Sequence, residues 1–151
     1  MKCRFILALL ALLTLFAGSS AFSQAVVTLP PMSTITFAPG STVSTVAGQM
    51  APGGRNVYYV PAKAGQTLSV SVTSTANGIT FQVYRPDATL AKGADGLAMV
   101  TGQTLPDAGP SDNAKAWIGA LPRDGNYLVL VGTCGTGVVA PTPYSLVVSL
   151  Q

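Results

Sequence analysis

Short runs in which apolar residues alternate with serine and threonine most constrain how this chain folds. The clearest run is QTLSVSVTS, residues 66–74, where Leu68, Val70 and Val72 occupy every second position. Because successive side chains of a β-strand point to opposite faces, a period of two predicts a strand with one buried face. Related runs occur at residues 41–50, 55–62, 79–85, 115–121, 126–133 and 143–150.

Turn-forming residues separate these runs at intervals of roughly 8–12 residues, as in β-sandwiches and barrels. The turn stretches are PGG, KAGQ, ANG, RPD and RDGN, and no window after residue 25 has a convincing helical period. The sequence therefore predicts an all-β fold, a single antiparallel β-sandwich of the jelly-roll kind with about seven to nine strands.

The first 25 residues have the features of a signal peptide. Lys2 and Arg4 precede an apolar run at residues 5–17, which is shorter than the roughly 20 residues of a transmembrane helix. Small residues at Ala25 and Ala21 give two candidate cleavage sites, and a retained signal anchor is a minor alternative. We expect a periplasmic or secreted protein, without a membrane span in its mature form, that is divided into a signal peptide (1–25), a linker (26–33) and a β-sandwich domain (34–151).

The charge of the mature chain gives no sign of a nucleic-acid partner. Removing the signal peptide leaves six basic and five acidic side chains, a net charge of +1. Nucleic-acid binding needs a clustered basic face, whereas the cations are scattered over Arg55, Lys63, Arg85, Lys92, Lys115 and Arg123.

The residue types present argue against catalysis. The chain has no histidine and no glutamate, which excludes catalytic triads with a histidine base and zinc sites built on histidine. The aspartates lie in turn-like stretches, where solvated acids are normal. We therefore expect a non-enzymatic protein with no cofactor and no metal.

Residues 86–114 interrupt the regular spacing of the predicted strands. A gap of this length is often functional or mobile, and a short hairpin around Ala98–Thr101 fits inside it. Calcium binding is a further hypothesis, because calcium takes oxygen ligands from loops, although the D-x-[DN]-x-[DN]-G pattern is absent. The candidate ligands are Asp87, Asp95, Asp107 and Asp112.

The single cysteine of the mature chain, Cys134, cannot form an intrachain disulfide. We expect it to be a small, half-buried residue at the end of a strand; the alternative is an intermolecular disulfide or a reactive thiol. The surrounding GTCGTG, residues 132–137, contains glycines spaced like part of a phosphate loop. A strand rather than a helix follows, which favours a hairpin loop.

Three aromatic residues are candidates for either the core or a sugar-binding surface. We expect Trp117 to be in the core, because a buried tryptophan contributes a large apolar area; the alternative is a platform on which a sugar stacks. Tyr58 and Tyr59 are consecutive and point to opposite faces, so that one of them is exposed or lies in a groove.

Two blocks, residues 53–87 and 117–150, resemble the bacterial pre-peptidase C-terminal type of β-sandwich. The shared features are a Y-x-x-x-A-x-x-G-Q-x-L-x-V-x-V strand pair, a Y-x-P-D turn, an L-P-x-x-G-x-Y hairpin and a final Y-x-L-x-V strand. The matching positions are Tyr58, Ala62, Gly65, Gln66, Leu68, Val70, Tyr84, Pro86, Asp87, Leu121, Pro122, Gly125, Tyr127 and Tyr144.

As a small secreted chain, the sequence is similar to the periplasmic inhibitors of g-type lysozyme, whose Ser-Gly-x-Tyr loop is implicated in entering the lysozyme cleft. Asp124 stands here at the position of that serine, while Gly125 and Tyr127 match. The inhibitors also carry basic residues shortly after the tyrosine, where this chain has LVLVGTCGTG.

The resemblance implies an exported binding protein that inhibits a g-type lysozyme or a related wall hydrolase. The 121–127 hairpin would occlude the cleft, with a partner loop formed by Arg123, Asp124, Gly125, Asn126 and Tyr127. One alternative is that this motif is only a turn, because Asp-Gly is favoured in hairpins by backbone geometry alone. Another is a stand-alone module that binds a carbohydrate or a protein of the cell envelope.

Overall fold

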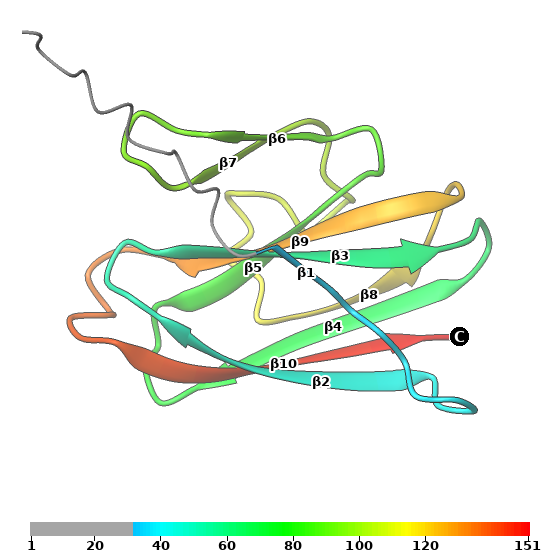
Figure 1. Ribbon diagram of the computed structural model, residues 1–151, viewed down its shortest axis with the longest axis horizontal. Coiled ribbons are helices and arrows are strands. Elements are labelled where there is room, and N and C mark those ends of the chain that lie inside the picture. The colour runs from blue at the N-terminus through cyan, green and yellow to red at the C-terminus, as the bar shows by residue number, and fades with distance from the viewer. Residues whose placement is uncertain (1–31) are drawn as a thin grey trace, which may run out of the picture.

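The structure, a computed structural model, describes residues 32–151 and consists of two packed β-sheets and a small third layer (Figure 1). One four-stranded sheet has the order β1-β3-β9-β5 and the other the order β2-β10-β4-β8. The strands are β1 (Met32–Thr34), β2 (Val43–Met50), β3 (Arg55–Ala62), β4 (Thr67–Ser74), β5 (Ile79–Tyr84), β6 (Thr89–Lys92), β7 (Ala98–Thr101), β8 (Ala116–Ala120), β9 (Gly125–Thr133) and β10 (Thr142–Leu150). The predicted all-β sandwich is confirmed.

Two details of the strand inventory differ from the prediction. The described part of the chain has ten strands rather than seven to nine, and β1 runs parallel to β3 in an otherwise antiparallel sheet. The expected signal peptide and residues 26–31 of the expected linker lie outside the described residues, whereas Met32 and Ser33 are part of β1.

The alternating pattern identifies the core correctly. Leu68, Val70 and Val72 on β4 are buried, and the main core between the sheets also takes Phe81 from β5 and Tyr127 from β9. Burial of these apolar side chains supplies the driving force that holds the sheets together.

The predicted hairpins at 121–127 and 132–137 are wrong. Successive strands of the sandwich lie alternately in one sheet and the other, so each of these connections crosses between the layers. Residues 121–124, here called the arch, lead from β8 in one sheet to β9 in the other, and residues 134–141 lead back from β9 to β10. The alternating pattern shows which side chains are buried, but it carries no information on which strands pair.

Residues 86–114 form an ordered cover rather than a long loop. The predicted hairpin around Ala98–Thr101 is confirmed as the antiparallel pair β6–β7. This hairpin lies on the outer face of the β1-β3-β9-β5 sheet (Figure 1), where a second apolar cluster includes Tyr84, Ala98, Leu128 and Leu130.

The rest of this segment pairs with the edge of β5. Val83 donates its backbone N–H to Ala108 (2.9 Å) and accepts one from Leu105 (2.8 Å). The segment thereby satisfies backbone groups that an exposed edge strand would present for pairing with another chain. Residues 32–151 contain no helix that is long and apolar enough to cross a membrane.

Candidate functional site

The predicted partner loop lies at the end of the sandwich where three connections meet. The arch contacts the turn between β3 and β4 through Asp124 and the turn between β5 and β6 through Arg123; Gly125, the first residue of β9, also approaches the β5–β6 turn. The arch is therefore fixed by segments that lie about 60 and 40 residues earlier in the chain.

Tyr127 is an internal support of the arch. Its side chain is fully buried, and its hydroxyl donates to the carbonyl of Arg123 (2.8 Å) and accepts the N–H of the same residue (3.3 Å). A tyrosine near the start of a strand that bonds to the backbone a few residues upstream is the tyrosine corner of β-sandwiches. The presence of Tyr127 in the motif is thus explained by the fold.

Asp124 and Gly125 are also held by neighbouring segments. The Asp124 Oδ1 accepts the backbone N–H of Ala64 at 2.7 Å, which ties the arch to the β3–β4 turn. Gly125 has a φ of 140°, and a Cβ built on it would lie 2.6 Å from the Cβ of Pro86. Both the backbone conformation and the close approach therefore require glycine at this position.

Arg123 forms an ion pair across the site. Its Nη2 lies 2.8 Å from the Oδ1 of Asp87, and both side chains are about half exposed, at 45% and 53%. The hydrogen bond from Arg123 lowers the pKa of Asp87 below its ordinary value of 3.8. The sequence places Asp87 in the Y-x-P-D turn but gives no sign that Arg123 is its partner.

The structure brings all five predicted residues together but gives them different surroundings. Arg123, Asp124 and Asn126 are exposed, Gly125 is half-buried and Tyr127 is inaccessible. Asn126 is exposed and is paired across the ladder with Pro61 on β3. The side chains available to a partner are therefore those of Arg123, Asp124 and Asn126.

The stretch after Tyr127 is apolar for a structural reason. Leu128 and Leu130 point away from the main core, but they lie beneath the β6–β7 hairpin and belong to the second apolar cluster. A cation at either position would be buried without a partner, which is costly. Lys63, Arg85 and Arg123 supply the positive charge at this end of the molecule instead.

The aspartates of residues 86–114 make separate contacts. No group of three or more histidine, cysteine, aspartate or glutamate side chains that could hold a metal ion occurs within residues 32–151. Instead, Asp112 accepts the N–H of Gly109 (2.6 Å), Asp95 accepts the N–H of Leu97 (3.0 Å), and Asp87 pairs with Arg123. Asp95 and Asp112 thus stabilise local turns, whereas Asp87 joins two segments distant in the chain.

None of the three aromatic candidates is fully exposed. Tyr58 is buried, and Tyr59 is half-buried against the cluster beneath the β6–β7 hairpin. Trp117 is half-buried rather than fully in the core, packs at the edge of the core, and donates its indole N–H to the carbonyl of Pro106 (2.8 Å).

Cys134 differs from its prediction. It is exposed rather than half-buried, directly after the end of β9 and at the opposite end of that strand from the arch.

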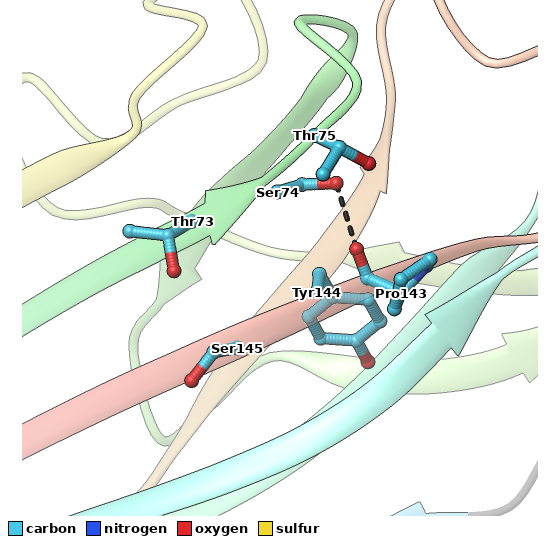
Figure 2. Close-up of a pocket in the computed structure, with 6 residues that line it drawn as sticks. All are labelled: Thr73, Ser74, Thr75, Pro143, Tyr144 and Ser145. Carbon is cyan, nitrogen blue, oxygen red and sulfur yellow. Dashed lines mark hydrogen bonds between the residues drawn. The ribbon is translucent and has the colours of Figure 1, made fainter.

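A shallow hollow of about 420 Å³ lies between the end of β4 and the start of β10 (Figure 2). Thr73, Thr75 and Ser145 line it, with Ser74 donating to the carbonyl of Pro143 at 2.8 Å. None of its lining residues carries a charge at neutral pH.

Comparison with known proteins identifies similar structures but no family. No family model matches the chain, and no curated protein matches it. The crystal structure of Aeromonas hydrophila PliG, a periplasmic inhibitor of g-type lysozyme, is similar with a TM-score of 0.61 and 27% identity, over 82% of this chain and 98% of that chain. Salmonella Typhimurium PliG, also a periplasmic inhibitor of g-type lysozyme, is similar with a TM-score of 0.55 and 16% identity, over 80% and 97%.

The pre-peptidase C-terminal domain of a Bacillus anthracis collagenase also matches, with 15% identity over 81% of this chain and 96% of that chain and a TM-score of 0.45. The resemblance of the sequence to the g-type lysozyme inhibitors is thus confirmed in the structure: the chain has the fold of the PliG proteins over most of its length.

Proposed function

We propose that this chain is an exported, non-catalytic protein of the periplasm or the secreted fraction that inhibits a g-type lysozyme or a related wall hydrolase. The observation that carries the proposal is the similarity to Aeromonas hydrophila PliG over nearly all of that protein. The arch is the part of the chain that enters the substrate cleft.

The rigidity of the arch supports this role. The Tyr127 hydroxyl, the Asp124 carboxylate and the Arg123–Asp87 ion pair fix it from three directions. A loop that is ordered before it binds loses less conformational entropy on binding, which increases affinity. Arg123, Asp124 and Asn126 remain exposed on this rigid support.

The test is lysis of a wall substrate by g-type, c-type and i-type lysozymes in the presence of mature chain, residues 26–151. We expect the chain to inhibit only the g-type enzyme, and we expect Asn126→Ala to weaken this inhibition. The matched control is Thr136→Ala, which changes an exposed residue at the opposite end of β9. Full activity of all three enzymes at saturating protein would contradict the proposal.

A second series separates direct contact from support of the arch at Asp124. Asp124→Asn keeps an oxygen that can accept the Ala64 N–H, whereas Asp124→Ala removes it. If the carboxylate charge contacts the enzyme, both variants lose inhibition. If Asp124 only holds the arch in place, Asp124→Asn retains inhibition.

The ion pair allows the same separation at Arg123. Asp87→Ala releases the Arg123 guanidinium without removing it, whereas Arg123→Ala removes it. If the guanidinium contacts the enzyme, only Arg123→Ala should inhibit weakly, because this variant alone loses charge complementarity at the interface. Equal losses in both variants assign Arg123 a supporting role.

A further inference from the structure

The two outer faces of the sandwich differ in a way that the proposed function does not use. The β6–β7 hairpin covers the β1-β3-β9-β5 sheet, whereas no described residue covers the outer face of the β2-β10-β4-β8 sheet (Figure 1). This second surface, here called the open face, consists of the side chains that alternate with the core residues on its four strands.

The open face carries no charge. Its two central strands present serine and threonine together with Val147 and Pro143, and its edge strands present alanine, threonine, Gln49 and two large apolar side chains. These two are Val43, which is 47% exposed, and Ile118, which is 70% exposed. An uncharged surface fits an uncharged partner rather than a charged one, because it offers no charges for complementary pairing.

One row across the open face reads nearly the same in both directions. The registers place Val43 on β2, Ser149 on β10, Ser69 on β4 and Ile118 on β8 side by side. The row is therefore apolar, serine, serine, apolar. A two-fold axis parallel to the strands, between two face-to-face copies, would set Val43 of each copy against Ile118 of the other and Ser149 against Ser69.

We propose that the open face binds the open face of a second copy of this chain and forms a two-fold symmetric dimer. Interfaces with such symmetry use the same patch on both subunits. The facing sheets lie about 10 Å apart, as in sheet-on-sheet packing. The alternative two-fold axis runs parallel to the sheets but perpendicular to the strands. It would place the row of Val43 and Ile118 against the row of Gln49 and Pro143.

The size of the open face sets the expected affinity. Four strands of about seven residues cover about 450 Å² in projection, from the spacing of strands and residues. This area is below the roughly 600 Å² that each partner buries in stable specific complexes and fits a weak, transient contact. We therefore expect a dimer that dissociates at micromolar concentrations.

The arrangement leaves the arches free. A two-fold axis parallel to the strands keeps their direction, so that both arches lie at the same end of the dimer and outside the interface. The dimer can therefore form whether or not the chain inhibits a lysozyme, and the two proposals fail independently.

Sedimentation equilibrium of the mature chain, from about 1 to 100 μM and with a reductant that keeps Cys134 reduced, tests the proposal. We expect a monomer–dimer equilibrium, weakened at least tenfold by Ser69→Asp because the new carboxylate is buried without a partner. Ser111→Asp adds the same charge to an exposed residue of the β7–β8 connection, away from the open face, and is the control. A monomer at all concentrations, or a dimer unaffected by Ser69→Asp, would overturn the proposal.

A charge exchange tests the orientation. V43D and I118K should each weaken the dimer, and the double variant V43D/I118K should restore it, because each new carboxylate then faces a new ammonium group of the other copy. Failure of the double variant to recover would overturn this orientation. The proposal would be wrong if the original chain were monomeric and bound insoluble wall glycan, and if Ser69→Asp abolished that binding. The open face would then bind a glycan.

Discussion

Tyr144 shows at the scale of one residue how the two sheets are locked together. Its ring covers Gly48 on the neighbouring β2, and its hydroxyl hydrogen-bonds to the Tyr58 hydroxyl and accepts the Asn56 side-chain amide (2.7 Å). The side chain thus starts in one sheet and finds its polar partners on β3 of the other sheet. A buried hydroxyl left without partners would destabilise the fold.

Gly48→Ala should destabilise the protein by about 2 kcal/mol, in the range for overpacked cores. A Cβ at this position would lie 2.5 Å from Cζ of the Tyr144 ring, which is buried and whose hydroxyl is held by Asn56 and Tyr58. Chemical denaturation measures the effect. Gly132→Ala is the control, because its Cβ would meet nothing closer than 3.7 Å, and an equal loss in both variants would contradict the expectation.

Alkaline pH should destabilise the protein through Tyr58. Burial, followed by the hydrogen bond with Tyr144, raises the pKa of Tyr58 above its ordinary value of 10.0. The folded state therefore binds the phenol proton more tightly than the unfolded state. The contribution of Tyr58 to the free energy of unfolding is complete below pH 10 and is lost as the pH rises above that value. Urea denaturation from neutral pH to pH 11 should show a smaller loss in Tyr58→Phe than in the original chain; identical slopes would refute this account.

At the scale of the element, the β6–β7 hairpin determines which side chains are tolerated on the outer face of β9. The hairpin is too short to be stable alone, and it depends on the second apolar cluster, to which Leu90 and Val100 contribute. Leu128 and Leu130 are therefore apolar because they lie beneath this hairpin, although they follow the exposed residues of the arch closely in the chain.

Val100→Asp should detach this hairpin while the sandwich stays folded. Val100 faces the cluster, whereas Met99 beside it is 46% exposed, so Met99→Asp is the matched control. Hydrogen exchange should show faster exchange in β6 and β7 for Val100→Asp only, with little change in β4 and β10, because local openings can occur without global unfolding. Uniformly faster exchange across all strands would show that the hairpin unfolds only with the whole domain.

At the scale of the molecule, the two ends of the sandwich have different compositions. The arch end carries Lys63, Arg85, Asp87, Arg123 and Asp124, whereas the other end is formed by uncharged connections that include Cys134 and the 86% exposed Val139. The nine residues of β9 separate these ends by about 30 Å, at about 3.3 Å per residue.

Attachment of a maleimide–polyethylene glycol to Cys134 should therefore leave inhibition unchanged. The same label on Asn126→Cys in a Cys134→Ser background should abolish inhibition, because the polymer would then lie next to the arch. Lysis assays compare the two conjugates at equal concentration. Loss of inhibition by the Cys134 conjugate alone would place the working surface at the opposite end of the molecule.

The sequence by itself determined the strands and their buried faces. The run at 66–74 predicts β4, and its alternation correctly assigns Leu68, Val70 and Val72 to the core. This was possible because the direction of a side chain along a strand is a local property with a period of two.

Only the tertiary structure decided how these elements pair and what each loop residue does. The turn at Asp124 and Gly125 is an arch between sheets rather than a hairpin, and Tyr127 supports it from inside the core. The Arg123–Asp87 ion pair and the Asp124–Ala64 hydrogen bond join residues distant in sequence. Such contacts depend on which strands become neighbours, and this is set by packing of the whole core rather than by any local pattern.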